Sequence, residues 1–399
     1  MGSVYPPLRL KKDEDRRLRA GHLWVFSNEV DTAATPLDDF TPGAVVEIQA
    51  AGGRVLGTGY VNPHSLICAR MVSRDARHPL SASLLVHRIQ VALSLRERVF
   101  RVPYYRLIYG ESDGMPGLVV DRFGDTLVVQ LSTAGAEAMA DDVIGALEKV
   151  VRPTAILLRN DIPLRKLEDL ELYTRVVLGD IPERVTLEEN GVAFEAPLAA
   201  GQKTGWYYDH RDNRARLGRY VAGRRVLDVF SYIGAWGVQA AVAGAAEVVC
   251  VDSSAAALEL AHANAARNAV ADRVRTLEGD AFAALRSLRD DGQRFDVVIV
   301  DPPAFVKRRK DIREGTEAYR RLNELALRVL AKDGILVSAS CSYHLPRDEL
   351  RKLLQRAARH IDRNLTVLEQ GGQGPDHPVH PAIPETEYLK AFICRVLPA

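Results

Sequence analysis

The chain has 399 residues, of which 47% are hydrophobic and 26% are charged, as in folded globular proteins and unlike disordered chains. At about 100–200 residues per domain, this length predicts two to four domains. No apolar run reaches the roughly 18 residues of a membrane span, and the N-terminal stretch is charged where a signal peptide would be apolar. The 53 Lys and Arg residues nearly balance the 52 Asp and Glu residues, so bulk charge indicates no nucleic-acid partner.

The four cysteines are scattered along the chain and form no CxxC pair; they are Cys68, Cys250, Cys341 and Cys394. This spacing argues against a disulfide framework and against a structural zinc site. We therefore expect no metal, no membrane segment and a reducing, cytoplasmic location.

The first two segments of the chain differ in their pattern. Residues 1–75 alternate short β-type runs with Gly, Pro and Asn, which predicts a small β-rich domain. Residues 76–190 begin with an amphipathic helix from about Ser81 and continue with two strands joined by a tight turn at Phe123–Asp125. A second amphipathic helix ends at Pro153. We expect this segment to form a small α+β domain.

From residue 191 to residue 399, apolar strand-like runs alternate five times with helix-like segments. This pattern predicts a parallel, doubly wound α/β sheet with helices on both faces. The last two strand-like runs, LTVLEQGG and YLKAFICRVL, have no helical pattern between them and predict an antiparallel hairpin at the sheet edge. The predicted fold class is therefore α/β, a Rossmann-like C-terminal sheet preceded by a β-rich and an α+β domain.

Aspartates stand at or near the ends of four predicted strands: Asp228, Asp252, Asp280 and Asp301. A single such aspartate usually stabilises the next helix, but four at equivalent positions favour a ligand site beyond the strand ends. Asp252 follows Asp228 by 24 positions, close to the spacing at which an acidic side chain reaches a ribose hydroxyl. Asp280 and the following Ala281 are predicted to contact an adenine.

The loop after the first strand of this sheet, DVFSYIGAWG, lacks the GxGxxG pattern of nicotinamide dinucleotide sites. Only Gly234 and Gly237 remain, and Phe230 and Tyr232 stand where smaller residues are usual. The loop therefore indicates an adenosine ligand without a pyrophosphate.

These residues resemble the class I S-adenosylmethionine-dependent methyltransferases. The segments GQKTGWYYDHRDNR, VLDVFSYIGAWG, VVCVDSS, FDVVIVDPPAF, SASCS and HPAIPETEYLK together are similar to the bacterial ribosomal RNA large-subunit methyltransferase I family. The resemblance extends over essentially the whole chain, since LRLKKDEDRRLRAGHLWVFSNEV resembles that family's PUA domain and YGESDGMPGLVVDRFGD its central domain. It implies a PUA-like RNA-binding domain over residues 1–75, a central domain over 76–190 and a methyltransferase domain over 191–399.

The resemblance also implies S-adenosyl-L-methionine as cofactor, large-subunit (23S) ribosomal RNA as partner and 5-methylcytosine as product. The cofactor-binding residues that we expect are Lys203, Asp228, Phe230, Ser231, Gly234, Asp252, Ser253, Asp280 and Ala281. In the resembled family the segment before the first strand lines the cofactor pocket, and its further candidates here are Gln202, Thr204, Tyr207, Tyr208 and Asp209. The alternative for this segment is a capped helix start with a solvated, charged face.

Carbon 5 of cytosine is not nucleophilic, so its methylation requires a thiolate that adds to carbon 6. Cys341, in SASCSY, is predicted at the carboxyl end of the fifth strand and is the expected nucleophile, although a free cysteine is more often a small core residue. We expect Cys250 and Cys394 to be such core residues. Asp301, in DPPAF, is expected to hydrogen-bond the ring nitrogen or the amino group of the cytosine. The resemblance supports both roles, and the sequence identifies no base for the carbon-5 proton.

The DPPAF loop is also similar to the Asp-Pro-Pro-aromatic loop of methyltransferases that act on amino groups of adenine or guanine. Phe305 comes one residue later than in that pattern, and those enzymes need no cysteine. A methyltransferase of small molecules or proteins, and a non-catalytic RNA-binding assembly factor, are two further alternatives. The presence of Asp252, Asp301 and Cys341 argues against the assembly factor.

Basic residues cluster near the N-terminus, beside His22 and Trp24, and again directly after the DPPAF loop. Such groups neutralise phosphates, and an aromatic ring stacks on an unpaired base. The predicted RNA-binding residues are Lys11, Arg16, Arg17, Arg19, Trp24, Lys307 and Arg308. For the first cluster an ordinary solvated face is the alternative, because acidic residues interrupt it. The sequence leaves open whether the protein forms a homodimer.

Overall fold

A computed structural model describes residues 5–75, 77–198, 201 and 204–399. The chain divides into two compact units. The first unit comprises Met1–Val185, Pro197–Trp206 and Pro375–Thr386, and the second comprises Thr186–Ala196, Tyr207–Gly374 and Glu387–Ala399. Among the described residues, no helix combines the length and the apolar composition that a membrane span requires.

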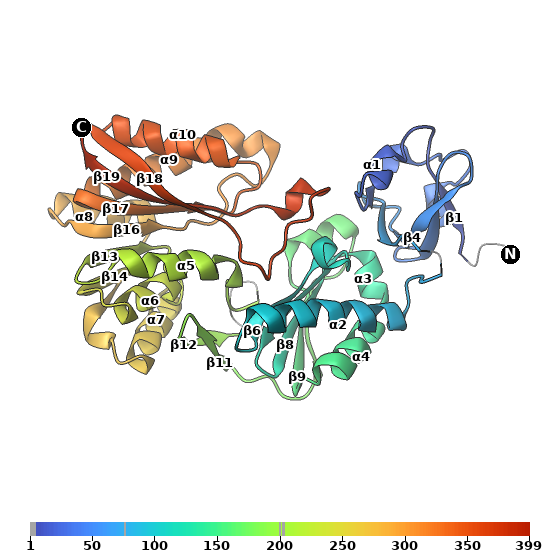
Figure 1. The fold of residues 1–399 in the computed structure, drawn as a ribbon, viewed down its shortest axis with the longest axis horizontal. Helices are drawn as coiled ribbons and strands as arrows, with labels where there is room; N and C mark the ends of the chain where they lie inside the picture. The colour runs from blue at the N-terminus through green and yellow to red at the C-terminus, as the bar shows by residue number, and fades with distance from the viewer. Residues whose placement is uncertain (1–4, 76, 199–200, 202–203) are drawn as a thin grey trace. The chain divides into compact units, whose positions relative to one another are not determined.

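The first unit begins with a five-stranded sheet of order β1-β3-β4-β5-β2. Figure 1 shows this part of the chain in blue. Its elements are β1 (Pro7–Arg9), α1 (Arg16–Arg19), β2 (Trp24–Val25), β3 (Val45–Gln49), β4 (Val55–Val61) and β5 (Ala69–Ser73). Alternating residues of these strands, such as Val46 and Ile48, are fully buried in one apolar cluster with Leu10 and Met71. The predicted β-rich start of the chain is therefore confirmed.

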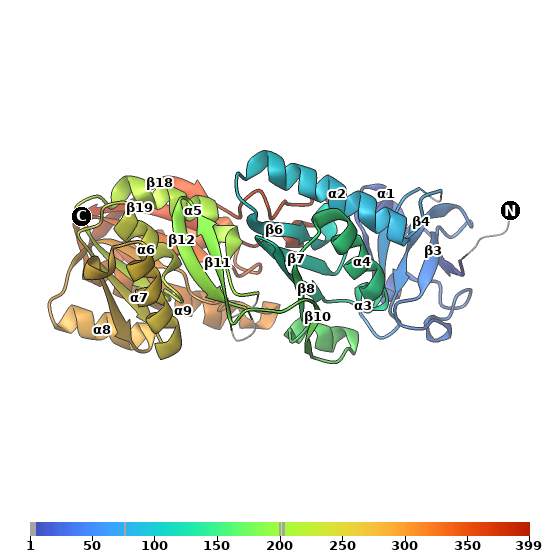
Figure 2. The ribbon, with the colours of Figure 1, turned by 90° about the horizontal axis from the view of Figure 1, so that it is seen from below.

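A second five-stranded sheet, of order β10-β9-β8-β7-β6, follows in the same unit. Its elements are α2 (Ala82–Val99), β6 (Tyr104–Tyr109), β7 (Leu118–Phe123), β8 (Thr126–Leu131), α3 (Ala134–Ala138), α4 (Ala140–Val151), β9 (Ala155–Arg159) and β10 (Thr174–Leu178). The hydroxyl of Ser81 accepts a hydrogen bond from the Leu84 amide at 3.3 Å and caps α2, which packs against α4 (Figure 2). The hairpin of β7 and β8 forms as predicted, whereas the expected second helix is divided at Met139 into α3 and α4.

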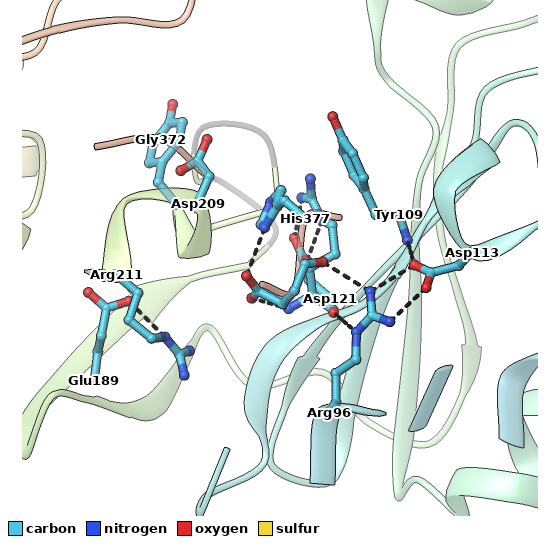
Figure 3. A network of polar contacts seen from close by, with 12 residues as sticks. Arg96, Tyr109, Asp113, Asp121, Glu189, Asp209, Arg211, Gly372 and His377 are labelled. Atoms are coloured by element: carbon cyan, nitrogen blue, oxygen red, sulfur yellow. Dashed lines mark hydrogen bonds and ion pairs between the residues drawn. The ribbon is translucent and has the colours of Figure 1, made fainter. Parts of the chain in front are cut away.

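The segment Pro375–Thr386 comes late in the sequence but belongs to the first unit. The side chain of Asp376 is fully buried, and its carboxylate accepts a hydrogen bond from the Arg106 amide at 3.0 Å. Arg96 donates to the Asp376 carbonyl oxygen at 3.0 Å and forms a bidentate pair with Asp113 at 2.7 Å (Figure 3). Buried, charge-assisted hydrogen bonds therefore anchor this segment to the first unit.

The second unit contains a seven-stranded sheet of order β15-β14-β13-β16-β17-β19-β18. Its elements are α5 (Arg211–Leu217), β13 (Arg225–Val229), α6 (Ala235–Val242), β14 (Glu247–Asp252), α7 (Ala255–Arg267), β15 (Val274–Glu278), α8 (Ala281–Asp290), β16 (Phe295–Val300), α9 (Ile312–Val329), β17 (Leu330–Ser340), α10 (Arg347–Arg359), β18 (Arg363–Gly371) and β19 (Lys390–Pro398). Helices α6 and α7 cover one face of the sheet, and α9 and α10 cover the other (Figure 1). The predicted α/β class and its five strand–helix repeats are confirmed.

The last two strands of the second unit form the expected antiparallel hairpin at the edge of the sheet. The final strand of the chain, β19, is the inner one of the two. Strand β19 lies between β17 and β18, and β18 is the outermost strand. The register pairs Ser340 at the end of β17 with Lys390 at the start of β19. The return of the chain therefore places the first residues of β19 beside the carboxyl end of β17.

A two-stranded hairpin, β11 (Arg184–Glu189) and β12 (Val192–Pro197), precedes the large sheet and was not predicted. The backbone amide of Glu195 donates to the side chain of Asn264 on α7 at 2.8 Å, which attaches β12 to the second unit. The boundary expected between residues 190 and 191 lies in the turn of this hairpin. The division into three domains stays a prediction.

Candidate active site

The loop between β13 and α6 has an unusual backbone. Phe230 and Tyr232 have φ angles of 67° and 48°, and Gly234 has a φ of 82°. Left-handed backbone is unfavourable for residues with a side chain, and it persists where surrounding contacts impose it, often at functional sites. Here the carboxylate of Asp252 accepts hydrogen bonds from the Tyr232 amide at 2.9 Å and from the Ser254 amide at 3.0 Å. The end of β14 therefore holds this loop in one shape.

Asp228 lies beneath the loop rather than on its surface. Its side chain is fully buried, and its carboxylate accepts a hydrogen bond from the Gly237 amide at 2.9 Å. A Cβ atom at Gly237 would lie 2.6 Å from the sulfur of Cys250 and 3.2 Å from the carboxylate of Asp228. Glycine at this position therefore allows α6 to approach the sheet closely. Cys250 is a fully buried core residue, as expected, and so is Cys394.

The burial of Asp228 leads to a prediction about stability. Burial raises the pKa of this carboxyl to about 7, opposed by the Gly237 hydrogen bond and assisted by the charge of Asp301. Because the folded pKa lies above the unfolded one, the stabilisation from this group is complete below the unfolded pKa and is lost as pH rises through the folded pKa. The difference in free energy of unfolding between Asp228→Asn and the wild type should therefore shift in favour of the variant as pH rises. The shift should amount to about 2–4 kcal/mol between about pH 4 and about pH 8. Denaturant titrations of both proteins at several pH values would measure this difference, and a difference that does not change with pH would contradict the prediction.

The other expected cofactor residues lie at the starts of the neighbouring helices. Asp280 is exposed and caps α8, since its carboxylate accepts a hydrogen bond from the Ala283 amide at 2.9 Å. Ala281 is buried in the first turn of α8, and Ser253 is exposed before α7. The cap of α7 is Ser254. Asp280 therefore stabilises the start of α8, and its contact with an adenine stays a prediction.

Asp301 follows β16 and is held from two sides. His210 Nε2 lies 3.2 Å from one carboxylate oxygen, and Trp236 Nε1 donates to the other at 3.1 Å. Burial by itself would raise the pKa of Asp301, but His210 and Trp236 outweigh it and the pKa is lowered. The side chain keeps 19% of its surface exposed. The site therefore presents an ionised carboxylate of defined orientation.

The sequence did not identify His210 and Trp236 as partners of Asp301. Both stand in segments that carry the family resemblance, His210 in GQKTGWYYDHRDNR and Trp236 in VLDVFSYIGAWG. Their residue types were therefore visible, but their convergence on one carboxylate depends on the tertiary fold, which brings α6 and the turn before α5 to Asp301.

Cys341 stands in the turn that follows β17, and the hydroxyl groups of its neighbours hold this turn. Ser340 donates to the Tyr319 hydroxyl at 2.9 Å, and the hydroxyl oxygens of Tyr319 and Ser342 lie 3.0 Å apart. The Val306 amide, directly after DPPAF, donates to the Ser342 hydroxyl at 3.1 Å. Cys341 is partly exposed, whereas the other three cysteines are buried. Ser342 thus joins the DPPAF loop to the turn that carries the accessible thiol.

Tyr207 connects the loop after β13 with Asp301 and Cys341. Its ring meets that of Tyr232 edge-on, with the centroids 5.9 Å apart. Burial raises the pKa of Tyr207 strongly, and the charges of Tyr232, Asp209, Asp301 and Cys341 raise it further. The loop, the carboxylate and the thiol therefore border one region at the carboxyl ends of β13, β16 and β17.

Of the candidates in the segment before α5, two are not described and two are engaged with other parts of the chain. Lys203 and Gln202 lie outside the described residues. The hydroxyl of Thr204 donates to Asp121 in the first unit. Asp209 accepts a hydrogen bond from the Tyr388 hydroxyl at 2.6 Å. In the described part of the chain, no group of His, Cys, Asp and Glu side chains has the arrangement to hold a metal ion.

The predicted RNA-binding residues fall into two kinds. Those near the N-terminus contact neighbouring groups. Lys11 donates to the Asn28 carbonyl oxygen at 2.8 Å, and the Trp24 indole donates to Glu111 at 2.9 Å. The three arginines form ion pairs: Arg16 with Asp13 at 3.0 Å, Arg17 with Glu29 at 2.6 Å and Arg19 with Asp15 at 3.1 Å. Lys307 and Arg308 are exposed, and Arg308 pairs with Asp311 at 3.1 Å. The cations of the first cluster are thus paired with neighbouring groups, the second cluster presents its cations beside the DPPAF loop, and RNA binding by both clusters stays a prediction.

Comparison with known families agrees with this architecture. Residues 173–395 match the S-adenosylmethionine-dependent methyltransferase family, and residues 8–74 match the PUA-like domain family. The chain is therefore an S-adenosylmethionine-dependent methyltransferase with a PUA-like domain at its N-terminal end, and the expected cofactor is confirmed.

Individual relatives define the family more narrowly. The chain is 38% identical over 395 residues to "Ribosomal RNA large subunit methyltransferase I" of Erwinia tasmaniensis, covering 98% of this chain and 99% of the relative. The protein of the same name from Serratia proteamaculans gives the same identity and coverage. A solved methyltransferase in complex with SAH has the same fold, with a TM-score of 0.83 at 21% identity over 98% of this chain and 100% of that one. The chain belongs to the ribosomal RNA large subunit methyltransferase I family, as the sequence motifs predicted.

Proposed function

We propose that this protein methylates carbon 5 of a cytosine in 23S ribosomal RNA through a covalent adduct on Cys341. The observation that carries the proposal is the accessible thiol of Cys341 in a turn that Ser342 ties to the loop of the ionised Asp301. A fixed carboxylate and a nucleophile at neighbouring strand ends suit an attack on a pyrimidine ring. The choice of RNA rests on the name that the relatives carry.

The residues around the β13–α6 loop fit the cofactor. The left-handed backbone of this loop, the close approach at Gly237 and the carboxylate of Asp252 form a rigid border at the strand ends. We assign cofactor binding to Lys203, Asp228, Phe230, Ser231, Gly234, Asp252, Ser253, Asp280 and Ala281. Asp228 contributes to the cofactor site indirectly, because its carboxylate accepts a hydrogen bond from Gly237 in α6. S-adenosylmethionine supplies an electrophilic methyl group.

The proposed reaction passes through a covalent adduct between Cys341 and the base. The Cys341 thiolate forms a bond to carbon 6 of the cytosine, and the electron pair of the 5,6 double bond moves toward carbon 5. The ionised carboxylate of Asp301 accepts a hydrogen bond from the amino group, or from the ring nitrogen when that nitrogen is protonated, and so orients the base. Carbon 5 then takes the methyl group, and the electron pair of the broken bond stays on the departing sulfur. Loss of the carbon-5 proton to a base re-forms the double bond and expels the Cys341 thiolate.

The test is identification of the methylated nucleoside. The full chain is incubated with methyl-labelled S-adenosylmethionine and unmodified 23S ribosomal RNA, and the RNA is digested to nucleosides. We expect label in 5-methylcytosine, and none when the RNA already carries the modification. Label in a methylated adenine or guanine would contradict the proposal and favour the amino-group alternative.

The amino-group alternative has less support from the site. It requires an aromatic side chain that stacks on an extruded base. Phe305 packs instead on Tyr319, with the ring centroids 4.8 Å apart, and lies 6.3 Å from the ring of Phe282. The aromatic residue of DPPAF is thus partly buried and packs against another ring of the protein.

We propose that two regions of the protein bind the RNA. Lys307 and Arg308 would contact phosphates beside the catalytic loop, and the PUA-like domain, with Lys11, Arg16, Arg17, Arg19 and Trp24, would hold a second part of the RNA. We infer a cytoplasmic location, as the spacing of the cysteines predicted.

A further inference from the structure

Lys390 is a buried cation at the edge of the site, and the reaction described above does not use it. It is the first residue of β19, only 5% of its surface is exposed, and it pairs across the sheet with Ser340. Ser340 directly precedes Cys341. Strand pairing therefore fixes a lysine beside the turn that carries the thiol.

The ammonium group of Lys390 is held inside this turn. It donates to the carbonyl oxygen of Tyr388 at 2.8 Å and to the carbonyl oxygen of Ser342, the residue after Cys341. Burial of a charge is costly unless hydrogen bonds or an opposite charge compensate it. Carbonyl oxygens supply hydrogen bonds but no net charge, so a nearby anion would stabilise this ammonium further.

The charged and titratable groups around Lys390 come from several elements. Burial lowers the pKa of Lys390 to about 8; the negative charge of Cys341 opposes this shift, Arg347 on α10 adds to it and Glu387 opposes it. Arg347 also lies 3.7 Å from Glu387, whose side chain is 55% exposed. Cys341 is therefore the anionic group with the largest effect on Lys390.

Two tyrosines in the described part of the chain also interact with the charge of Cys341. Tyr319 on α9 and Tyr207 both have their pKa values raised, first by burial and also by the negative charge of Cys341. Both are neutral in the ordinary pH range and cannot compensate a thiolate. Among the described residues, Lys390 is thus a cation beside the turn of Cys341, bonded to the carbonyl oxygen of the next residue, Ser342.

We propose that the Lys390 ammonium stabilises the thiolate form of Cys341 and thereby makes this cysteine reactive at neutral pH. The thiol proton leaves to solvent, and Lys390 stays protonated, so it acts as a positioning residue through Cys341. A cation beside a cysteine favours the thiolate, which is the nucleophilic form. The use of this thiolate in RNA methylation rests on the proposed function.

The test measures the rate at which iodoacetamide alkylates Cys341 in the full chain as a function of pH, with peptide mass spectrometry to identify the site. The wild type should show an apparent pKa below the ordinary thiol value of about 8.5. Lys390→Gln keeps a donor for the carbonyl oxygens but removes the charge. It should raise that pKa by about 1–2 units, which slows alkylation at neutral pH about tenfold or more.

Two further variants distinguish an effect of the Lys390 charge on the thiol from an effect of the substitution on the structure. Lys390→Arg keeps the positive charge and should retain a lowered thiol pKa. Lys352→Gln removes an exposed lysine of α10, which pairs with Glu349 at 2.7 Å, and should leave the profile unchanged.

A wild-type thiol pKa at or above the ordinary value would overturn the proposal without any variant. An unchanged profile in folded Lys390→Gln would overturn it as well. Alkylation needs neither RNA nor cofactor, so its outcome is independent of the methylated product. A lowered thiol pKa together with a product other than 5-methylcytosine would contradict only the proposed function.

Discussion

Replacement of Cys341 by alanine is expected to reduce methyl transfer to RNA by about a thousandfold or more. The substitution removes the only partly exposed thiol among the described cysteines, and no adduct at carbon 6 can then form. Cofactor affinity should change little, because the loop after β13 is held by Asp252 and not by Cys341. Label incorporation into RNA and calorimetric titration with S-adenosylmethionine would measure the two properties separately.

The matched control is Cys394→Ala, the same substitution at a fully buried position of β19, which should keep turnover in the folded protein. A second readout is RNA that contains 5-fluorocytidine, because fluorine at carbon 5 cannot leave as a proton and the adduct accumulates. The wild type should form a complex that survives denaturing electrophoresis, and Cys341→Ala should form none. Retained turnover in Cys341→Ala would exclude the thiolate mechanism.

Replacement of Asp301 by asparagine is expected to lower turnover about a hundredfold or more while leaving cofactor binding nearly intact. Asparagine keeps the shape and one acceptor for Trp236, but it removes the negative charge opposite His210. The lowered pKa of Asp301 keeps the carboxylate ionised in the neutral range. The wild-type pH profile should therefore show loss of this group only in acid, as pH falls through its lowered pKa. Initial rates over a range of pH values would check both expectations.

A matched control for this change is Asp311→Asn, which removes an exposed carboxylate paired with Arg308 near the same loop. It should change turnover far less than Asp301→Asn. Trp236→Phe removes one of the two donors to Asp301 and should have an intermediate effect, about tenfold. Equal turnover in Asp301→Asn and the wild type would remove Asp301 from the reaction.

The PUA-like start and the Rossmann-like sheet could be predicted because their signal is local. Parallel strands that are covered on both faces read as continuous apolar runs, such as FDVVIV, and helices such as α10 read as apolar residues at helical spacing. The hairpin of β11 and β12 was missed because its alternation of buried and more exposed residues runs over only six residues in each strand. The division at Met139 depends on backbone geometry that periodicity does not report.

The order of elements and the chemical groups at the strand ends, including Asp252, Asp301 and Cys341, could be predicted from the chain's pattern. The contacts of His210 and Trp236 with Asp301, and the place of Lys390 beside the turn of Cys341, could not. Periodic burial is encoded within each element, residue by residue. The meeting of distant side chains depends instead on strand order and register, and here β19 returns antiparallel beside β17 and pairs Lys390 with Ser340.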